Sequence, residues 1–287
     1  MEKTPTSAMQ ADAENDFRPA QCRVFAVVNQ KGGVGKTTTT VNLATALAAV
    51  GMRVLVVDLD PQGNASTGFG IPRANRIRGG YEILFDELTV EDVAMPTAIP
   101  NLHVVTSSAD LAGAEIQLVT EPRRESRLRE ALNRSANHFD YMLIDCPPSL
   151  NLLTLNALVA AHAVLVPLQV EFYALEGISS LLQTIDAVRA RFNAALEIHG
   201  VVLTMFDRRN GLSAAVAEDV RAYFGDKVFA TVIPRNIRIS EAPSYGKPVL
   251  LYDLKCPGSR AYMRLAGEVL QREKAIDAAR REEAEVA

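Results

Sequence analysis

The chain has 287 residues, of which 48% are hydrophobic and 22% charged, and its formal net charge is −4. This composition predicts a globular protein with a sizeable core, built as one large domain or two small ones. The acidic balance excludes nucleic-acid binding through overall charge, so such binding requires a local basic patch. No apolar run approaches the about 20 residues that span a bilayer, and no secretory signal is evident, so we expect a cytoplasmic protein. Cys22, Cys146 and Cys256 lie far apart, which favours reduced thiols over a disulfide frame or a zinc site.

The chain divides into three parts by composition. Residues 1–21 are polar and alanine-rich without periodicity, and we expect a disordered tail. Residues 22–270 are predicted to form a single domain. Within its last helix, from residue 259, apolar side chains recur at i, i+3, i+4, i+7 and i+8, which is typical of a helix packed on a core. Residues 271–287 are strongly charged and are expected to be a helix end or a second tail.

A glycine-rich segment follows the first predicted strand. Residues 24–28 are apolar and predict a buried strand, and residues 37–50 predict a helix. Backbone N–H groups of a glycine turn, together with the helix N-terminus, bind phosphate. We expect Lys36 to bring positive charge to the β- and γ-phosphates and Thr37 to bring a hydroxyl to Mg²⁺. The predicted nucleotide contacts are Lys31, Gly32, Gly33, Val34, Gly35, Lys36, Thr37 and Thr38.

Two further apolar runs end in carboxylates. Residues 54–58 predict a strand that ends at Asp58 and is followed by Asp60, and residues 140–145 predict a strand that ends at Asp145. Ligands of open α/β sheets bind at the carboxyl ends of the strands, so these acids are expected beside the phosphate loop. The pattern at Asp145 is that of a Walker B strand, whose aspartate holds Mg²⁺, usually through a water. A turn cap before Pro61 is the structural alternative for Asp60.

Apolar strands alternate with helices along the rest of the domain. This order predicts an α/β fold with a doubly wound, mostly parallel sheet flanked by helices. The other predicted elements are strands over residues 102–105, 163–168 and 200–205 and helices over residues 109–119, 123–136 and 171–192.

The phosphate loop departs from the standard pattern at two positions. Gln30 stands where the first glycine is usual, and Lys31 is an additional lysine. The sequence K-G-G-V-G-K-T-T therefore resembles the deviant Walker A motif of the ParA/MinD/nitrogenase-iron-protein superfamily of P-loop NTPases. In that family the extra lysine reaches across a nucleotide sandwich dimer to the partner's phosphates, which implies a catalytic role for Lys31 beside Lys36. The run D-L-D-P-Q-G-N-A-S-T-G resembles the second ParA motif. It implies that Asp60 positions the attacking water and that Asp58 supports the magnesium shell.

Two later stretches also resemble ParA proteins. They are T-M-F-D-R-R-N from residue 204 and I-P-R-N-I-R-I-S-E-A-P-S-Y-G-K-P from residue 233. The resemblance implies that Arg209 and Arg238 contact DNA without sequence preference, with Arg235 as a further candidate, and that Pro234 and Asn236 frame the adenine. Seven basic against five acidic residues give the segment 204–247 a charge of +2. A mixed, solvated surface is the alternative explanation of those charges.

The resemblance covers about residues 23–270 and implies a ParA/Soj-type DNA-partitioning ATPase. Such a protein hydrolyses ATP with Mg²⁺ and forms an ATP-dependent homodimer on non-specific double-stranded DNA. Hydrolysis, stimulated by a ParB/Spo0J-type centromere-binding partner, releases the dimer, so we expect a nucleoid-associated protein. A MinD-type membrane-cycling ATPase is the main alternative, which the balanced to acidic C-terminal charge disfavours. A metabolic or electron-transfer enzyme is disfavoured by the missing cysteine pair and substrate motif. Chromosomal and plasmid cargo are not distinguished.

Overall fold

The computed structural model describes residues 17–171, 174 and 176–286. Its seven-stranded sheet has the order β3-β4-β2-β5-β1-β6-β7, and every neighbouring pair is parallel except β3 and β4. The doubly wound, mostly parallel sheet predicted from the sequence is confirmed. The strands are β1 (Arg23–Val27), β2 (Val54–Asp58), β3 (Ala94–Pro96), β4 (Leu102–Val105), β5 (Tyr141–Asp145), β6 (Ala163–Gln169) and β7 (Glu197–Thr204).

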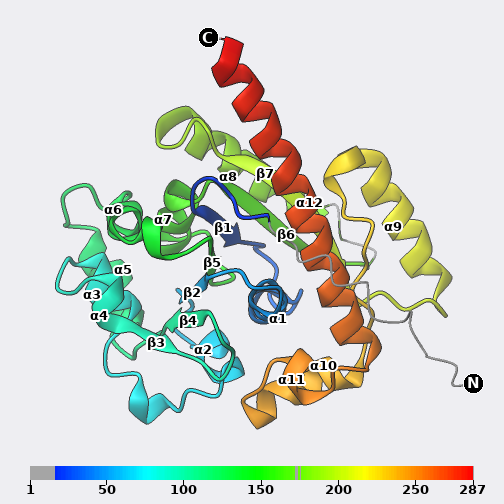
Figure 1. Cartoon of the computed structure of the whole chain (residues 1–287), viewed down its shortest axis with the longest axis horizontal. Coiled ribbons are helices and arrows are strands. Elements are labelled where there is room, and N and C mark those ends of the chain that lie inside the picture. The colour runs from blue at the N-terminus through cyan, green and yellow to red at the C-terminus, as the bar shows by residue number, and fades with distance from the viewer. Residues whose placement is uncertain (1–16, 172–173, 175, 287) are drawn as a thin grey trace, which may run out of the picture.

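Helices cover both faces of this sheet (Figure 1). One apolar core includes residues of α1 and α12, and the other includes residues of α5, α6, α7 and α8. The helices are α1 (Lys36–Ala49), α2 (Asn64–Gly68), α3 (Gly80–Leu84), α4 (Val90–Val93), α5 (Leu111–Leu118), α6 (Arg127–Arg134), α7 (Leu152–Ala160), α8 (Glu176–Arg191), α9 (Gly211–Phe224), α10 (Ile237–Glu241), α11 (Val249–Tyr252) and α12 (Pro257–Val286).

The strand β2 shows why these apolar runs form central strands. All five of its residues are buried. Val54 and Val56 belong to the core beneath α1 and α12, whereas Leu55 and Val57 belong to the opposite core. A strand buried on both faces needs apolar side chains at every position, which is the continuous pattern read from the sequence.

Three elements differ from the sequence prediction. The helix expected over residues 123–136 begins only at Arg127, because Arg123 has a positive φ of 54° that no α-helix accommodates. The helix expected from residue 171 begins at Glu176, and residues 172, 173 and 175 of that expectation lie outside the described residues. The antiparallel strand β3 was not predicted, since three partly exposed residues ending in Pro96 carry little strand signal.

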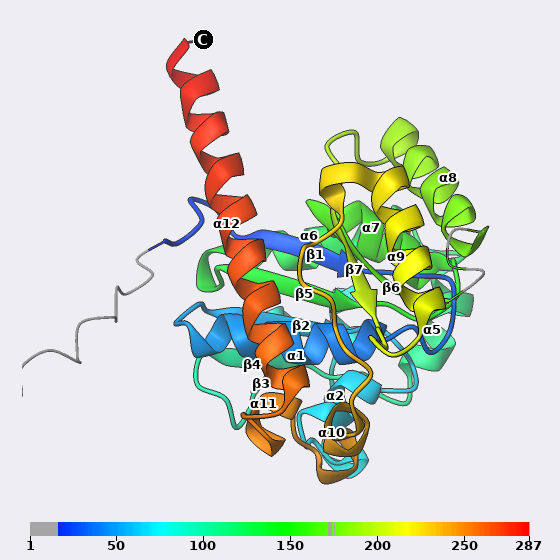
Figure 2. The same cartoon turned by 90° about the vertical axis from the view of Figure 1, so that its right-hand side faces the viewer.

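The C-terminal helix α12 runs unbroken for 30 residues. Its predicted apolar stripe, which includes Tyr262, Leu265 and Val269, is buried, so that prediction is confirmed. The helix lies against α1 and continues through the charged residues beyond 271 until it projects past the rest of the fold (Figure 2). Over the described residues, the structure has no helix whose length and apolar character would let it cross a membrane.

The last residues of the expected N-terminal tail contact the folded domain. Residues 1–16 lie outside the described residues. Arg18 forms an ion pair with Asp140 at 2.8 Å, and the backbone N–H of Ala20 donates to Asp277 of α12 at 3.0 Å. These contacts draw residues 17–21 onto the domain, and the ordered fold therefore begins before residue 22.

A buried ion pair ties the first strand to the last helix. Arg23 donates two hydrogen bonds to Glu273, at 2.6 and 3.1 Å, and the two side chains are only 3% and 0% exposed. Glu197 accepts a further bond from Arg23 at 3.1 Å. His199 lies 3.3 Å from Glu273, and burial, assisted by Arg23, lowers the pKa of His199 to about 3. The imidazole is therefore neutral, and Glu273 is the fully buried counter-charge of Arg23.

We expect Glu273→Gln to lower the free energy of unfolding by about 3 kcal/mol, because it leaves the buried Arg23 guanidinium without that counter-charge. Urea denaturation measures the change. Asp186→Asn is the matched control: it removes an exposed partner of Arg189 and should cost under about 1 kcal/mol. Equal losses in the two variants would contradict the role of the buried pair.

Candidate functional site

The loop between β1 and α1 has the geometry of a phosphate cradle. Gly35 precedes the first residue of α1 with φ at 91°, in the left-handed region that glycine adopts readily. The Thr204 hydroxyl at the end of β7 donates to the Val34 carbonyl at 2.8 Å, which fixes the loop against the sheet. The backbone N–H groups at the start of α1 have no helical partners of their own and are available to an anion.

Lys36 lies inside this loop. Its residue is only 7% exposed, and its ammonium group donates to the Lys31 carbonyl at 3.0 Å. Burial lowers the pKa of Lys36, while Asp145, Cys146 and Asp60 act in the opposite direction. A partly desolvated cation held beside carboxylates is a strong attachment point for a phosphate.

Two aspartates lie side by side beneath the loop. Asp58 and Asp145 end the adjacent strands β2 and β5 in matching register, and both are fully buried. One oxygen of Asp58 accepts from the Ser66 backbone N–H at 2.8 Å and the Ser66 hydroxyl at 2.6 Å. One oxygen of Asp145 accepts from the Thr40 hydroxyl at 2.9 Å. The remaining oxygen of each carboxylate is buried and has no hydrogen-bond partner among the described residues.

These unpartnered oxygens have an electrostatic signature. Burial raises the pKa of both Asp58 and Asp145, and their mutual repulsion raises the pKa of Asp145 further. A hard cation beside the pair would neutralise them and favour their ionised forms. No cluster of three His, Cys, Asp or Glu side chains within the described ranges forms a complete metal site. The donor set therefore fits Mg²⁺ that takes further oxygens from a hydroxyl, water or phosphate.

Asp60 lies closer to the loop opening. It is 7% exposed, and one carboxylate oxygen accepts from the Gln62 backbone N–H at 3.0 Å. Arg76 is buried nearby and donates to the Gly63 carbonyl at 2.9 Å and to the Ile71 carbonyl at 2.6 Å. Arg76 thus braces the segment after Asp60 against movement.

Two cavities meet at the phosphate loop. The first has a volume of about 290 Å³ and contains Lys36, Thr37 and Asp60 in its wall. The second has a volume of about 380 Å³ and contains Pro234 and Asn236, the residues expected to frame the adenine. Both cavities share the lining residues Gly35, Thr38 and Met205.

Lys31 is placed differently from the rest of the predicted loop contacts. Its side chain is 45% exposed and forms an ion pair with Glu171 of the same chain. It does not line either cavity. The structure therefore brings Lys36, Thr37 and Asp60 together and leaves the Lys31 ammonium group at the mouth of the loop.

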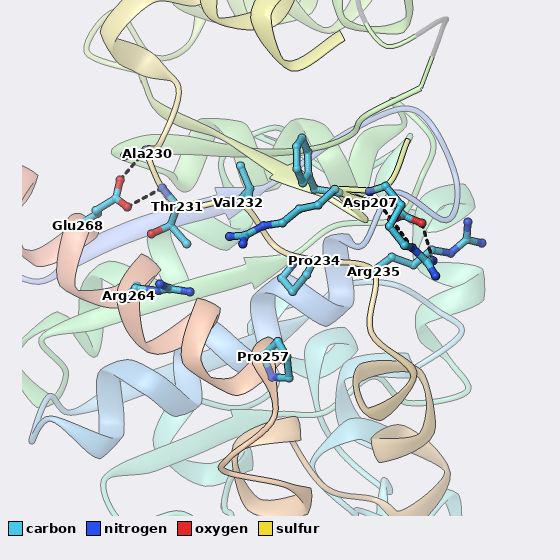
Figure 3. Close-up of a pocket in the computed structure, with 12 residues that line it drawn as sticks. Asp207, Ala230, Thr231, Val232, Pro234, Arg235, Pro257, Arg264 and Glu268 are labelled. Carbon is cyan, nitrogen blue, oxygen red and sulfur yellow. Dashed lines mark hydrogen bonds and ion pairs between the residues drawn. The ribbon is translucent and has the colours of Figure 1, made fainter. Parts of the chain in front are cut away.

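The three arginines expected to contact DNA lie in different settings. Arg209 is 89% exposed and pairs with Asp207 at 2.8 Å. Arg238 pairs with Glu241 at 3.0 Å. Arg235 lines the cavity of Pro234 and Asn236, and it also lines a third cavity of about 660 Å³ between the segment after β7 and α12 (Figure 3).

Several residues that shape the site were not singled out from the sequence. Ser66 and Thr40 orient the buried aspartates, and Arg76 braces the loop after Asp60. Met205 has a positive φ of 54° and separates the two cavities. The only sequence signal for Met205 is its place directly after a buried strand, where ligand-binding loops begin in parallel sheets.

Comparisons with known proteins agree with this site. The family model of an AAA domain matches residues 22–198. The chromosome partitioning protein ParA of Caulobacter vibrioides is 61% identical over 88% of this chain and 95% of its own length. The sporulation initiation inhibitor protein Soj of Bacillus subtilis is 53% identical over 86% of this chain and 98% of its own length.

Solved structures share the fold. A Mycobacterium smegmatis protein described as cobyrinic acid a,c-diamide synthase, with bound ATP analogue and magnesium, is 37% identical at a TM-score of 0.78, over 88% of this chain and 96% of that one. The septum site-determining protein MinD of Pyrococcus horikoshii, complexed with Mg-ADP, is 27% identical at a TM-score of 0.72, over 86% of this chain and 96% of that one.

The sheet order, the loop and the strand-end aspartates define a P-loop NTPase of the deviant Walker A class. Within that class the relatives of highest identity quoted above are partitioning proteins, at 61% and 53%. The chain belongs to the ParA/Soj family of chromosome-partitioning proteins.

We expect Lys36→Ala to abolish nucleotide binding, because it removes the one ammonium group that faces the phosphate cavity. Thr37→Ala should weaken binding mainly when Mg²⁺ is present. Fluorescent-nucleotide titration with and without Mg²⁺ measures both effects, and circular dichroism checks that the variants fold. The exposed lysine variant Lys255→Ala is the control and should bind as wild type does. Unchanged ATP affinity in Lys36→Ala would contradict the assignment of the loop.

Proposed function

We propose that this chain is an ATP-dependent DNA-partitioning protein. It binds ATP with Mg²⁺, closes into a sandwich homodimer, and binds double-stranded DNA without sequence preference in that state. Hydrolysis of ATP to ADP and phosphate, stimulated by a ParB-type partner, ends the DNA-bound state. The observation that carries the proposal is the phosphate loop above two neighbouring strand-end aspartates, each with a buried, unpartnered oxygen.

The roles of the site residues follow from their positions. Backbone N–H groups of residues 32–38 and the Lys36 ammonium would hold the triphosphate, since all of them surround one cavity. Thr37 would ligate Mg²⁺ directly, and Asp58 and Asp145 would face its shell through their free oxygens. The metal supplies charge neutralisation at the β- and γ-phosphates. Asp60 would orient the attacking water, because phosphoryl transfer depends mainly on positioning.

The base end of the groove supports ATP as the nucleotide. Pro234 offers an apolar surface, while Asn236 caps α10 through its side-chain oxygen, which accepts from the Arg238 backbone N–H at 2.9 Å. The Asn236 amide NH₂ makes no hydrogen bond among the described residues. An unpaired donor beside an apolar wall suits a purine ring that carries acceptor nitrogens.

DNA binding measured with ATP, with ADP and without nucleotide is the direct test of this function. The chain has a net charge of −4, so a monomer should bind DNA poorly. Pairing two chains doubles the basic surface on one assembly, and linked contacts gain through effective concentration. Binding should therefore require ATP and be equal on unrelated duplexes.

A salt titration by fluorescence anisotropy tests the contacts. Arg209→Ala and Arg238→Ala should each lower the log–log salt slope by roughly 0.9, because each removes one phosphate contact. Wild-type slopes in both variants would exclude these arginines. Equal wild-type binding with and without ATP would contradict the nucleotide switch itself.

A second prediction separates assembly from chemistry. Asp60→Ala should retain ATP and accumulate as a dimer, since the water is no longer oriented while the phosphate cradle is intact. Lys31→Ala should bind ATP and stay monomeric, because the lysine that would cross to the partner is absent. Size-exclusion chromatography with ATP measures both. A monomeric Asp60→Ala or a dimeric Lys31→Ala would contradict the assigned roles.

A further inference from the structure

The largest of the three cavities described above is lined by arginines and lies apart from the phosphate loop. Arg208 belongs to the segment after β7, Arg235 precedes α10, and Arg264 belongs to α12. Together they line the cavity of about 660 Å³, which we name the arginine pocket. Figure 3 places Arg264 on α12 at one side of the pocket and Arg235 at the other, with Pro234 between them.

The three guanidinium groups of the arginine pocket have no internal counter-charge. None of them makes a hydrogen bond or ion pair with another described residue, whereas Arg209 and Arg238 are both paired with acids. Like charges around one cavity repel each other and focus a positive potential on it. Such an arrangement is relieved by an anion from outside.

The two acids in the wall of the pocket do not supply that anion. The Glu268 carboxylate accepts the backbone N–H groups of Ala230 and Thr231, at 2.8 and 2.7 Å (Figure 3). The Asp207 carboxylate accepts from the side chain and the backbone N–H of Arg209. Both are engaged by other groups, so the pocket presents guanidinium donors to a ligand.

The chemistry of these donors selects the ligand. A guanidinium group offers a planar fork of N–H donors that matches phosphate oxygens. The lining of the pocket includes no asparagine or glutamine, the side chains that pair bidentately with adenine. A ligand held here would therefore be recognised by its phosphoryl charge and not by its bases.

We infer that the arginine pocket is a phosphate-binding subsite, separate from the ATP phosphate cavity, that takes a phosphate of a nucleic-acid backbone. Arg208 and Arg264 are its contacts, in addition to Arg235. The inference rests on the proposed DNA binding and extends it to α12, a helix outside the segment where the sequence placed DNA contacts. A free oligophosphate would supply the same phosphoryl chemistry, and the experiment distinguishes the two sources.

The choice of variants follows from the shared wall. Pro234 and Arg235 line both the arginine pocket and the cavity expected to hold the adenine. Arg235→Ala would therefore disturb nucleotide binding as well. Arg208 and Arg264 line only the arginine pocket among these cavities, so their variants report on it alone.

The test is an anisotropy salt titration of the full chain with ATP and Mg²⁺ on two unrelated duplexes. Arg208→Ala and Arg264→Ala should each lower the log–log slope by roughly 0.9 on both duplexes. Arg264→Lys keeps the charge and should keep the slope. Arg191→Ala, an exposed arginine in the last turn of α8, removes the same group elsewhere and should leave the slope unchanged.

A second measurement separates the sources of phosphate. With Mg-ADP saturating the nucleotide site, pyrophosphate should raise the thermal midpoint of wild type and not that of Arg264→Ala if the pocket takes free phosphoryl groups. That result with unchanged DNA slopes supports the phosphate subsite and assigns it to a free ligand. Unchanged slopes together with equal pyrophosphate shifts overturn the subsite. If wild type binds no DNA, the proposed function fails, and the pyrophosphate result alone decides the pocket.

Discussion

Two carboxylates buried next to each other are the constraint on which the site depends. Parallel pairing of β2 with β5 places Asp58 directly opposite Asp145, and pairing of β1 with β5 brings the phosphate loop to the same edge. Burial and repulsion disfavour their ionised forms. The hydrogen bonds from Ser66 and Thr40 satisfy one oxygen of each, which leaves the other two for a cation.

The rest of the groove is held to this centre by contacts between distant segments. Thr204 joins the end of β7 to the loop, and Asn42 of α1 accepts the Val249 backbone N–H at 2.7 Å. The segment of Pro234 and Arg235 then forms a wall between the adenine end of the groove and the arginine pocket. One short segment thus borders both the proposed nucleotide site and the proposed DNA site.

Much of this arrangement was predictable from the sequence because its signals are local. An apolar run, a glycine turn and Lys36-Thr37 specify a strand, a loop and a helix within 15 residues, and the carboxylates at Asp58 and Asp145 end runs of the same kind. The parallel sheet follows from the alternation of strands and helices. The apolar stripe of α12 likewise appeared as a regular periodicity, and its residues are buried.

The features that were missed depend on contacts between distant residues. The pairing of Lys31 with Glu171 joins residues 140 positions apart, and no pattern near Lys31 signals it. The counter-charge of Arg23 lies on α12 at Glu273, within a stretch that reads only as charged. The helix start at Arg127 depends on the positive φ of Arg123, a single backbone angle that composition does not encode.

The most direct test of the central claim is an experimental structure of the chain with Mg²⁺ and a non-hydrolysable ATP analogue. The account predicts the triphosphate along the backbone of residues 32–38, with the metal about 2.0–2.1 Å from the Thr37 hydroxyl. The free oxygens of Asp58 and Asp145 should face the metal's coordination shell, and the adenine should lie against Pro234 and Asn236. A metal remote from both aspartates, or a nucleotide outside this groove, would contradict the account.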